Sequence, residues 1–553
     1  LGVSLQTYFE HTGDPAILDE AIASGRAAVA AATGDDPVRS FHEFNLARSL
    51  TAHGLTSGDE RPLEEAIELL ESAASRDGAR PAIRVEAGRE WGELAMRLGR
   101  VEHAAHGFAI AVELLPRLAD RALLRADAAR WMARCSRLVG DAAACALSVG
   151  RADRAVELLE MGRGVLLAQA LESRTDLVEL REQNAVMADR FTYLCGRLDA
   201  EETGTSSDDG PDRRRELAEE LARLIAHIRT LPGLSRFLLL PEAAQLAAEA
   251  REGPIIMINL SQYRCDALIL TTDGVRVQEL PALDPATVHT RLTGVRDALD
   301  RTRDPGLGER RKAERDMYDT LTWLWDAVTG PVLERLGTTR SAQGDQSHGR
   351  VWWVPCGPLA YFPLHAAGHH LEEPAPGRRT VMDRVVSSYS PTVRALNHSR
   401  LRRAAQRRSH PPRMLVVAMP RTPGASDLPG AQRELGRLTG LFPAVTGLVG
   451  KEATRDAVLS RLPAGTWTHF ACHAAGDLAD PANSHLLVHD HAERPLRVLE
   501  VSRLRLEDSE FAYLSACGTA VTSPDPANSH LLVHDHVRVS SELEGRDDVD
   551  GLV

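Results

Sequence analysis

The chain has 553 residues, which is too many for a single hydrophobic core, so two or three domains are expected. Its 65 Lys and Arg residues against 78 Asp and Glu residues leave a formal net charge of −13, which excludes an overall basic field for nucleic acid or an anionic membrane. The seven cysteines are scattered and contain no C-x-x-C pair, which argues against a disulfide framework or a zinc finger.

No signal peptide and no apolar run of about 18 residues is found, so a soluble, cytosolic protein without a membrane contact is expected. The aromatic content is only 4%, and the abundance of Ala, Leu and Arg favours helices over an all-β fold. The chain begins at Leu1 within a helical pattern and without Met, so we expect a fragment or an incomplete gene product.

The first 175 residues repeat one pattern, in which an apolar helix face is followed by a small turn and an acidic amphipathic helix. The four copies occupy residues 5–22, 45–70, 91–115 and 146–159. Gly or Asp in each turn permits a tight reversal, and Ala and Leu at helical spacing allow paired helices to pack closely. The pattern resembles tetratricopeptide repeats with a longer spacing, and such solenoids present a groove to a protein partner. A plain helical bundle that supports the next domain is the alternative.

Residues 176–250 are expected to form a helical connector. A long helix is predicted to continue to about Asp199, and Glu201–Asp212 is acidic and typical of a flexible loop. A further helix is predicted near Arg213–Leu231, and it ends before Pro232 and Gly233.

From about Gly253 the pattern changes from helical to α/β. Three strand-like runs, Pro254–Leu260, Cys265–Thr272 and Val275–Leu280, are predicted to form a meander, and helices fill much of 284–336. Further buried-strand runs are expected at Val351–Val354, Met414–Ala418, Thr468–Ala474 and Phe511–Thr519, with helices near Gly430–Leu435 and Ala453–Leu462. This alternation predicts a mainly parallel sheet with right-handed crossovers.

The last two of these runs end in reactive side chains, His473 and Cys517. In open α/β sheets, ligands bind outside the carboxyl ends of the strands. Two neighbouring strands would therefore bring an imidazole and a thiol to one edge. A base that generates a thiolate, together with backbone N–H groups for the oxyanion, is the minimum apparatus of a cysteine nucleophile.

Three other motifs in the sequence give weaker indications of a functional site. Gly450-Lys451 lacks the upstream Gly and the following Ser or Thr of a phosphate-binding loop, so no nucleotide cofactor is expected. Ser484–His491 is rich in His but has no evident Cys or carboxylate partner, so a strand with polar ends is favoured over a metal site. The Arg run at Arg400–Arg413 has no interleaved aromatic residue, which favours a solvated linker over nucleic-acid binding.

Several short motifs together resemble the CHAT family, the caspase-like domains associated with tetratricopeptide repeats. Their order and spacing carry the resemblance, and they occupy residues 155–163, 352–359, 363–368, 388–392, 428–431, 469–473 and 514–517. The resemblance implies a caspase-like α/β domain over residues 251–523 and a cysteine peptidase of the caspase/separase class. A protein or peptide substrate, a protein partner on the helical repeats and no cofactor would follow.

In the pattern of this family, His473 is the general base and acid, and Cys517 is the nucleophile. The backbone N–H groups of Ala474 and Cys517 would hold the oxyanion. His469 shares strand parity with His473 but lies inside its run, whereas Cys472 has the opposite parity and is expected to be a buried thiol.

Two features depart from the family pattern. Ala474 stands where the family usually has Gly, and the segment Asp480–His491 recurs identically at Asp525–His536. Residues 524–553 are therefore expected to be a duplicated segment followed by an acidic, disordered tail, which would leave the strand of Cys517 without its usual support. Two alternatives remain: a catalytically inactive scaffold of CHAT type, and an inert fold in which His473 and Cys517 are core residues.

Overall fold

The computed structural model describes residues 2–32, 36, 38–118, 137–163, 177–200, 211–235, 237–238, 241–301, 306–338, 349–372, 378–406, 413–476, 483–504, 506 and 508–515. The chain divides into two compact units. One comprises Leu1–Val288, Asp326–Gly337 and Pro355–Gly357, and the other comprises His289–Trp325, Thr338–Val354 and Pro358–Val553. We call them unit 1 and unit 2.

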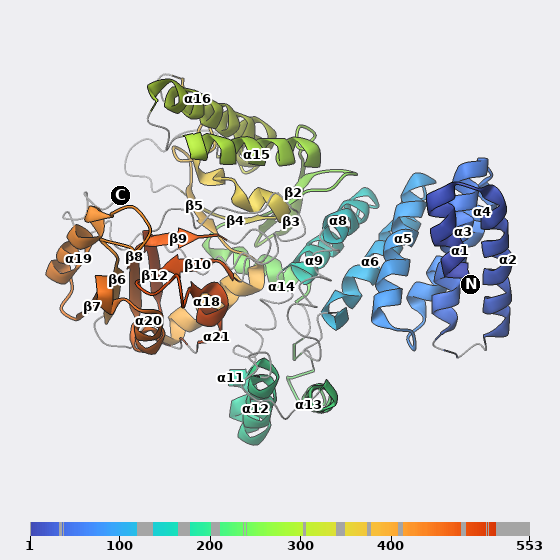
Figure 1. Cartoon of the computed structure of the whole chain (residues 1–553), viewed down its shortest axis with the longest axis horizontal. Helices are drawn as coiled ribbons and strands as arrows, with labels where there is room; N and C mark the ends of the chain where they lie inside the picture. The colour runs from blue at the N-terminus through green and yellow to red at the C-terminus, as the bar shows by residue number, and fades with distance from the viewer. Residues whose placement is uncertain are drawn as a thin grey trace. The chain divides into compact units, whose positions relative to one another are not determined.

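Unit 1 begins with helices that follow one another as antiparallel pairs (Figure 1). They are α1 (Gly2–Thr12), α2 (Pro15–Ala31), α3 (Arg39–Ser57), α4 (Glu60–Ser75), α5 (Pro81–Arg97), α6 (Val101–Leu118), α8 (Leu138–Ser148) and α9 (Ala152–Gly162). Each predicted repeat corresponds to one pair. This confirms a helical N-terminal region with the expected pairing.

The turns of the four pairs have a common conformation. Each holds a glycine in the left-handed region, with φ of 68° at Gly13, 73° at Gly58, 70° at Gly99 and 75° at Gly150. In the first two turns, the next residue is an Asp whose side chain accepts a backbone N–H of the following helix: Asp14 from Ala16 at 3.0 Å and Asp59 from Arg61 at 3.1 Å. Glycine ends one helix and aspartate begins the next, because the first adopts positive φ without strain and the second satisfies an unpaired donor.

The connector is helical, but its first part differs from the prediction. In place of one long helix, α11 (Leu177–Gln183) and α12 (Ala185–Ala200) are separated at Asn184, whose side-chain oxygen accepts the backbone N–H of Met187 at 3.1 Å. This Asn-type cap starts a new helix, which explains the break. The predicted helix near Arg213–Leu231 is α13 (Pro211–Ile228). Most of the acidic loop, residues 201–210, lies outside the described residues.

Unit 1 also contains the predicted meander. After α14 (Ala243–Ala248) and the 3-10 turn Glu249–Glu252, the strands β1 (Ile255–Asn259), β2 (Asp266–Thr271) and β3 (Gly274–Glu279) pair antiparallel in chain order. Every residue of β1 is buried, whereas β3 is partly exposed. Near this sheet, the Arg163 guanidinium donates to the Pro355 carbonyl and to the Cys356 sulfur, so two separate family motifs meet within unit 1.

Unit 2 holds the remaining helices and strands. The helices are α15 (Pro285–Arg301, which starts in unit 1), α16 (Leu307–Leu324), α18 (Val393–Gln406), α19 (Pro429–Leu441), α20 (Arg455–Arg461) and α21 (Val498–Arg503), while α17 (Gly330–Arg335) belongs to unit 1. The strands are β4 (Arg350–Pro355), β5 (Val386–Tyr389), β6 (Met414–Ala418), β7 (Val445–Val449), β8 (Trp467–Ala471), β9 (His473–Ala475), β10 (His485–Leu487), β11 (Leu496–Arg497) and β12 (Phe511–Ser515).

The main sheet of unit 2 is fully parallel in its described strands, with the order β12-β8-β6-β7 (Figure 1). Its two faces carry separate cores. On one face, Ala431 and Leu438 of α19 pack with Val416 and Ala471, and on the other face α20 packs over residues that include Val417 and Phe470. This is the two-sided burial of a doubly wound sheet. It confirms parallel strands for the α/β domain, beside antiparallel pairing in the smaller sheet β11-β10-β9.

Four strands were not predicted as separate strands, namely β5, β7, β9 and β11, and β9 overlaps the end of the predicted run Thr468–Ala474. Strand β7 carries exposed Thr446 and Gly447 and has only one buried residue, so no apolar run marks it. Strands β5 and β9 are short and only partly buried. The His-rich run Ser484–His491 is a strand only over β10, and its later residues form turns.

Candidate active site

The carboxyl edge of the parallel sheet has a topological switch point. From β6 the chain passes through α19 to β7 on one side, then returns through α20 to β8 on the other side of β6. The connections leaving the carboxyl ends of β6 and β8 therefore diverge. In sheets of this kind, the crevice at such a point is where ligands bind. The loop after β6 and the residues after β8 are thus the first place to look for a site.

His473 lies at this switch point. Strand β8 ends at Ala471, Cys472 forms a bend, and His473 opens β9, which pairs antiparallel with β10. The chain therefore changes sheets within two residues of the His473 side chain. His473 is partly buried, as a catalytic imidazole that must meet both its partners and a substrate would be.

The loop after β6 holds one nitrogen of the His473 ring. Nε2 lies 2.8 Å from the backbone carbonyl oxygen of Ser426, and the loop itself is closed by a hydrogen bond from the Leu428 N–H to the Pro420 carbonyl at 2.9 Å. A carbonyl can only accept, so Nε2 carries the proton in this contact. Nδ1 is then the nitrogen with a free lone pair in the neutral ring, and it is the one that can act as a base.

The hydroxyl of Ser426 also lies near the ring, with Oγ 3.5 Å from Nε2. A Ser–His nucleophile pair would need Nε2 to accept the hydroxyl proton within about 2.6–3.2 Å. Because the carbonyl of the same residue is closer and takes the Nε2 proton, the geometry does not favour Ser426 as a nucleophile.

Cys517 lies outside the described residues, so its side chain has no observed position. The strand that precedes it is described. Strand β12 pairs parallel with β8 from Phe511↔Trp467 to Ser515↔Ala471, and each pair differs by 44 residues (511 − 467 and 515 − 471). His473 and Cys517 differ by the same number, 517 − 473 = 44. This ladder ends two residues before His473 and Cys517, so it places side by side the strand ends that precede them.

Ala474, the predicted oxyanion residue, lies within β9 opposite Leu486. Among the described residues, Leu238 is the one non-glycine with positive φ. The backbone at position 474 is thus ordinary strand, and alanine fits it without strain. The departure from glycine at this position imposes no conformational cost.

Cys472 has the predicted environment. It is fully buried, with 0% exposure, in the core beneath α20, and burial raises the pKa of its thiol to about 12. A thiol of this kind is inert at neutral pH. The other described cysteines, Cys145, Cys195, Cys265 and Cys356, are also buried.

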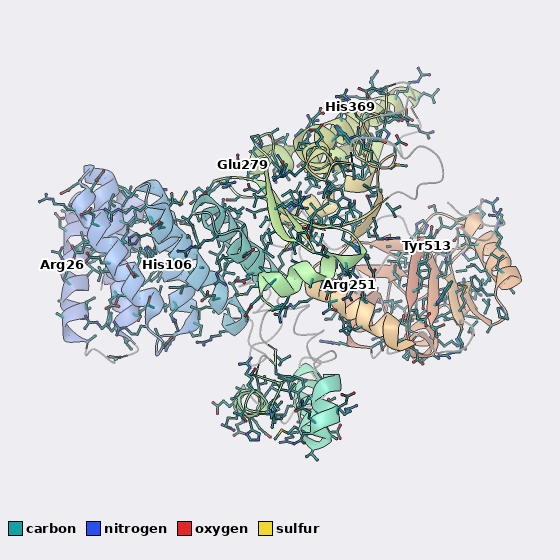
Figure 2. All side chains as sticks on the ribbon, turned by 180° about the vertical axis from the view of Figure 1, so that it is seen from behind. Arg26, His106, Arg251, Glu279, His369 and Tyr513 are labelled. Carbon is teal, nitrogen blue, oxygen red and sulfur yellow. The ribbon has the colours of Figure 1, made fainter. Side chains whose placement is uncertain are left out.

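His469 is bonded to a residue that the sequence reasoning missed. Its Nε2 lies 2.7 Å from Oε2 of Glu434 on α19, and its ring stacks on Tyr513 of β12 with centroids 5.1 Å apart and planes 4° apart. Tyr513 is labelled in Figure 2. The sequence predicts a helix that contains Glu434 but indicates no role for this side chain. The available signal was its position on the apolar face of that helix, between the buried Ala431 and Leu438.

Three other motif histidines, His365, His485 and His491, are hydrogen-bonded to protein groups. Nδ1 of His365 and its backbone N–H meet the Tyr389 hydroxyl at 2.9 Å and 2.8 Å, which joins two family motifs. His485 and His491 contact the backbone carbonyls of Asn483 and Pro423 at 3.1 Å and 2.9 Å. Within the described ranges, no group of three or more His, Cys, Asp or Glu side chains is placed to hold a metal ion. Nor does any helix there have the length and apolar content of a membrane span.

The fold and site define a doubly wound α/β domain with a histidine at its switch point. Comparison with protein families then identifies that domain: residues 318–535 match the family model of the CHAT domain. The chain therefore contains a CHAT domain, as its motifs indicated. The CHAT domain is a caspase-like family, which is compatible with either a peptidase or an inactive scaffold. No curated protein matches the chain.

Proposed function

We propose that this chain is a caspase-like cysteine endopeptidase in which His473 and Cys517 form the catalytic dyad. The observation that carries the proposal is the register of β8 and β12, because the sequence separation of His473 and Cys517 equals the offset of every pair in that ladder. Neighbouring strands lie about 4.8 Å apart. The ladder ends two residues before each of them, so His473 and Cys517 follow from adjacent strand ends, where an imidazole and a thiol can meet for a proton transfer.

In this mechanism, Nδ1 of His473 takes the proton of the Cys517 thiol, and the thiolate attacks the carbonyl carbon of the scissile peptide bond. Backbone N–H groups of Ala474 and Cys517 donate to the oxyanion of the tetrahedral intermediate. The imidazolium then protonates the leaving amine, and water, deprotonated by the same ring, hydrolyses the thioester. The Ser426 carbonyl, 2.8 Å from Nε2, holds the ring and stabilises the imidazolium that forms in each half of the cycle.

Labelling with a thiol-reactive peptide electrophile tests the dyad. We expect the wild-type protein to be labelled at Cys517, and the His473→Ala variant to be labelled about 100-fold more slowly, because general-base catalysis contributes roughly this much. Cys472→Ala serves as the matched thiol control and should label like wild type. Equal labelling rates for wild type and His473→Ala would rule out the proposed dyad.

The second candidate function is a catalytically inactive scaffold that binds a protein on its helix pairs. A hollow of about 120 Å³ on these helices supports partner binding, and its lining includes Glu71, His103, His106 and Arg151. The mixed charges of these side chains suit a polar peptide segment. Cleavage activity and scaffolding are separable, because a Cys517→Ala variant would retain partner binding and lose peptidase activity. Full biological activity of that variant would favour the scaffold.

A further inference from the structure

One carboxylate in unit 2 contacts both strands that lead to the dyad. Glu434 lies in the second turn of α19, and its two oxygens face different strands. Oε2 is 2.7 Å from Nε2 of His469 on β8, and Oε1 is 3.5 Å from Oγ of Ser515 on β12. The first contact is short, and the second is at the long end of hydrogen-bond distances.

A ring contact joins the same two strands independently. His469 and Tyr513 are direct partners in the parallel ladder, and their rings stack with centroids 5.1 Å apart. His469 is 5% exposed, whereas Tyr513 is 39% exposed and covers the outer side of the histidine. Glu434 thus fixes one end of the imidazole while the neighbouring strand packs on its face.

These contacts matter because β12 is the outermost of the described strands in its sheet and has β8 as its one described neighbour. The alignment of two paired strands depends on their ladder and on cross-strand side-chain contacts. Ser515 is two residues before Cys517, and His469 is four residues before His473. The contacts of Glu434 are therefore made just upstream of both reactive residues.

The same helix also continues from the loop that holds His473. Ser426, whose carbonyl accepts from Nε2 of His473, lies three residues before Pro429, the first residue of α19. Movement of α19 relative to the sheet would displace the Ser426 carbonyl and disturb the Glu434 contacts to both β8 and β12. A displacement of about 1 Å between reacting groups can cost about 100-fold in rate.

We propose that Glu434 is a positioning residue, which aligns β12 with β8 through Ser515 and His469 and thereby aligns the strand ends from which His473 and Cys517 follow. This inference rests on the proposed dyad. Glu434 itself would touch neither substrate nor the reacting atoms.

The alignment can be measured without any peptidase activity. In a Thr468→Cys, Ala512→Cys variant, the two introduced thiols should form a disulfide in a glutathione redox buffer, because Thr468 and Ala512 are direct partners in the β8–β12 ladder and the required Cα separation of about 4.4–6.8 Å includes the spacing of neighbouring strands. Adding Glu434→Ala should slow disulfide formation about 10-fold. Glu434→Gln keeps the size of the side chain, an oxygen that accepts from His469 and an amide that can donate to the Ser515 hydroxyl, and it should restore the rate to within about threefold. Gln432→Ala, at an exposed position on the same helix, is the matched control and should leave the rate unchanged.

The second measurement is the rate at which a peptide electrophile labels Cys517 in the parent chain, which carries no introduced cysteine. The Glu434→Ala variant should be about 10-fold slower than wild type, with partial recovery in Glu434→Gln. If disulfide formation follows the predicted order but the parent chain is not labelled, the dyad fails as a catalyst while the positioning role stands. An unchanged disulfide rate in Glu434→Ala overturns the positioning role whatever the labelling shows.

A further variant covers the case in which Glu434→Ala does not fold. His469→Phe keeps an aromatic ring against Tyr513 and removes the nitrogen that Glu434 contacts. We expect it to slow disulfide formation about 10-fold, the effect expected for Glu434→Ala. A parental rate in this folded variant would overturn the role of Glu434.

Discussion

In the proposed mechanism, His473 is held by a backbone atom rather than by a third side chain. The carbonyl of Ser426 accepts the Nε2 proton, and a carbonyl at this place is retained whatever residue occupies position 426. The hydroxyl of the same residue is more distant, at 3.5 Å. A role for the Ser426 carbonyl and a role for its hydroxyl therefore lead to opposite expectations for one substitution.

The Ser426→Ala variant distinguishes these two roles, because it removes the hydroxyl and keeps the carbonyl. Because the carbonyl remains, we expect the rate of Cys517 labelling to stay within about twofold of wild type, whereas loss of a nucleophilic hydroxyl would abolish turnover. The measurement is the labelling rate together with hydrolysis of a peptide substrate. Ser460→Ala, an exposed serine on α20, is the control for removing a surface hydroxyl. A loss of about 100-fold in the first variant alone would assign the chemistry to Ser426.

Ala474 supports a second prediction at this scale. Its backbone is ordinary strand, so Ala474→Gly relieves no strain and adds freedom to the unfolded chain. We expect the free energy of unfolding to fall by about 0.5–1 kcal/mol and the labelling of Cys517 by a small electrophile to be unchanged. Denaturant unfolding and labelling rates test both statements. A large gain in labelling would show that the alanine methyl group obstructs the oxyanion site.

At the scale of elements, the long periodic segments could be predicted and the short ones could not. The four helix pairs and the strands β6 and β8 follow from apolar spacing and from Gly and Asp at the turns, which are local signals. Strand β7 could not be found, because its exposed Thr446 and Gly447 give it no apolar run. It forms by pairing with β6, a contact that local sequence does not encode.

The candidate site shows the same division. The position of His473 just after a buried strand could be predicted from its motif, and the burial of Cys472 from strand parity. The roles of Glu434 and of the Ser426 carbonyl could not, because both depend on how α19 and its preceding loop pack against the sheet. Backbone acceptors carry no sequence signal, and a glutamate in an amphipathic helix is usually solvated.

Within the helix pairs, α5 carries a charge cluster with a stability consequence. Glu90 contacts Arg89 at 3.4 Å and Arg48 at 3.7 Å, while Arg89 also pairs with Glu86 and Glu93. Burial raises the pKa of Glu90 to about 7, and the two arginines offset this only in part. Between about pH 4.5 and pH 7, the unfolded chain has lost this proton and the folded chain has kept it. Stability therefore falls as pH rises through that window.

Glu90→Gln removes the titration while keeping the shape. We expect the variant to resemble wild type near pH 4.5 and to exceed its free energy of unfolding by about 1–3 kcal/mol at pH 8, where wild type must hold a charged, half-buried carboxylate. Urea unfolding at both pH values provides the measurement. Glu68→Gln, at an exposed position on α4, is the matched control and should show no such pH dependence. A variant less stable than wild type at pH 8 would show that the arginine contacts outweigh burial.

At the scale of the whole molecule, chain order and compact units do not coincide. The change from helical to strand sequence near Gly253 falls inside unit 1, which continues to Val288 and then takes back Asp326–Gly337 and Pro355–Gly357. The matched CHAT region, residues 318–535, therefore supplies segments to both units. The parallel sheet with His473 belongs to unit 2, whereas the helix pairs and the meander share unit 1.

The segment Asp326–Gly337, which belongs to unit 1, leads to a prediction about fragments of the chain. Val328, Val332 and Leu333 lie in residues 326–337 and are fully buried, each with 0% exposure. A fragment of residues 1–288 lacks them, whereas a fragment of residues 1–337 retains them. Full burial of an aliphatic side chain contributes about 1.5–3 kcal/mol. The three together thus contribute several kcal/mol to unit 1, a large part of the stability of an ordinary domain.

We therefore expect fragment 1–288 to unfold at a markedly lower denaturant concentration than fragment 1–337, or to remain partly unfolded. Circular dichroism during urea unfolding measures this difference. A Val332→Ala, Leu333→Ala variant of the longer fragment is the control for added length, and it should lose about 4–8 kcal/mol, a cost set by the lost burial and the cavity. Equal midpoints for the two wild-type fragments would contradict the assignment of residues 326–337 to unit 1. In that case the helix pairs and the meander would be stable without any segment of the matched CHAT region.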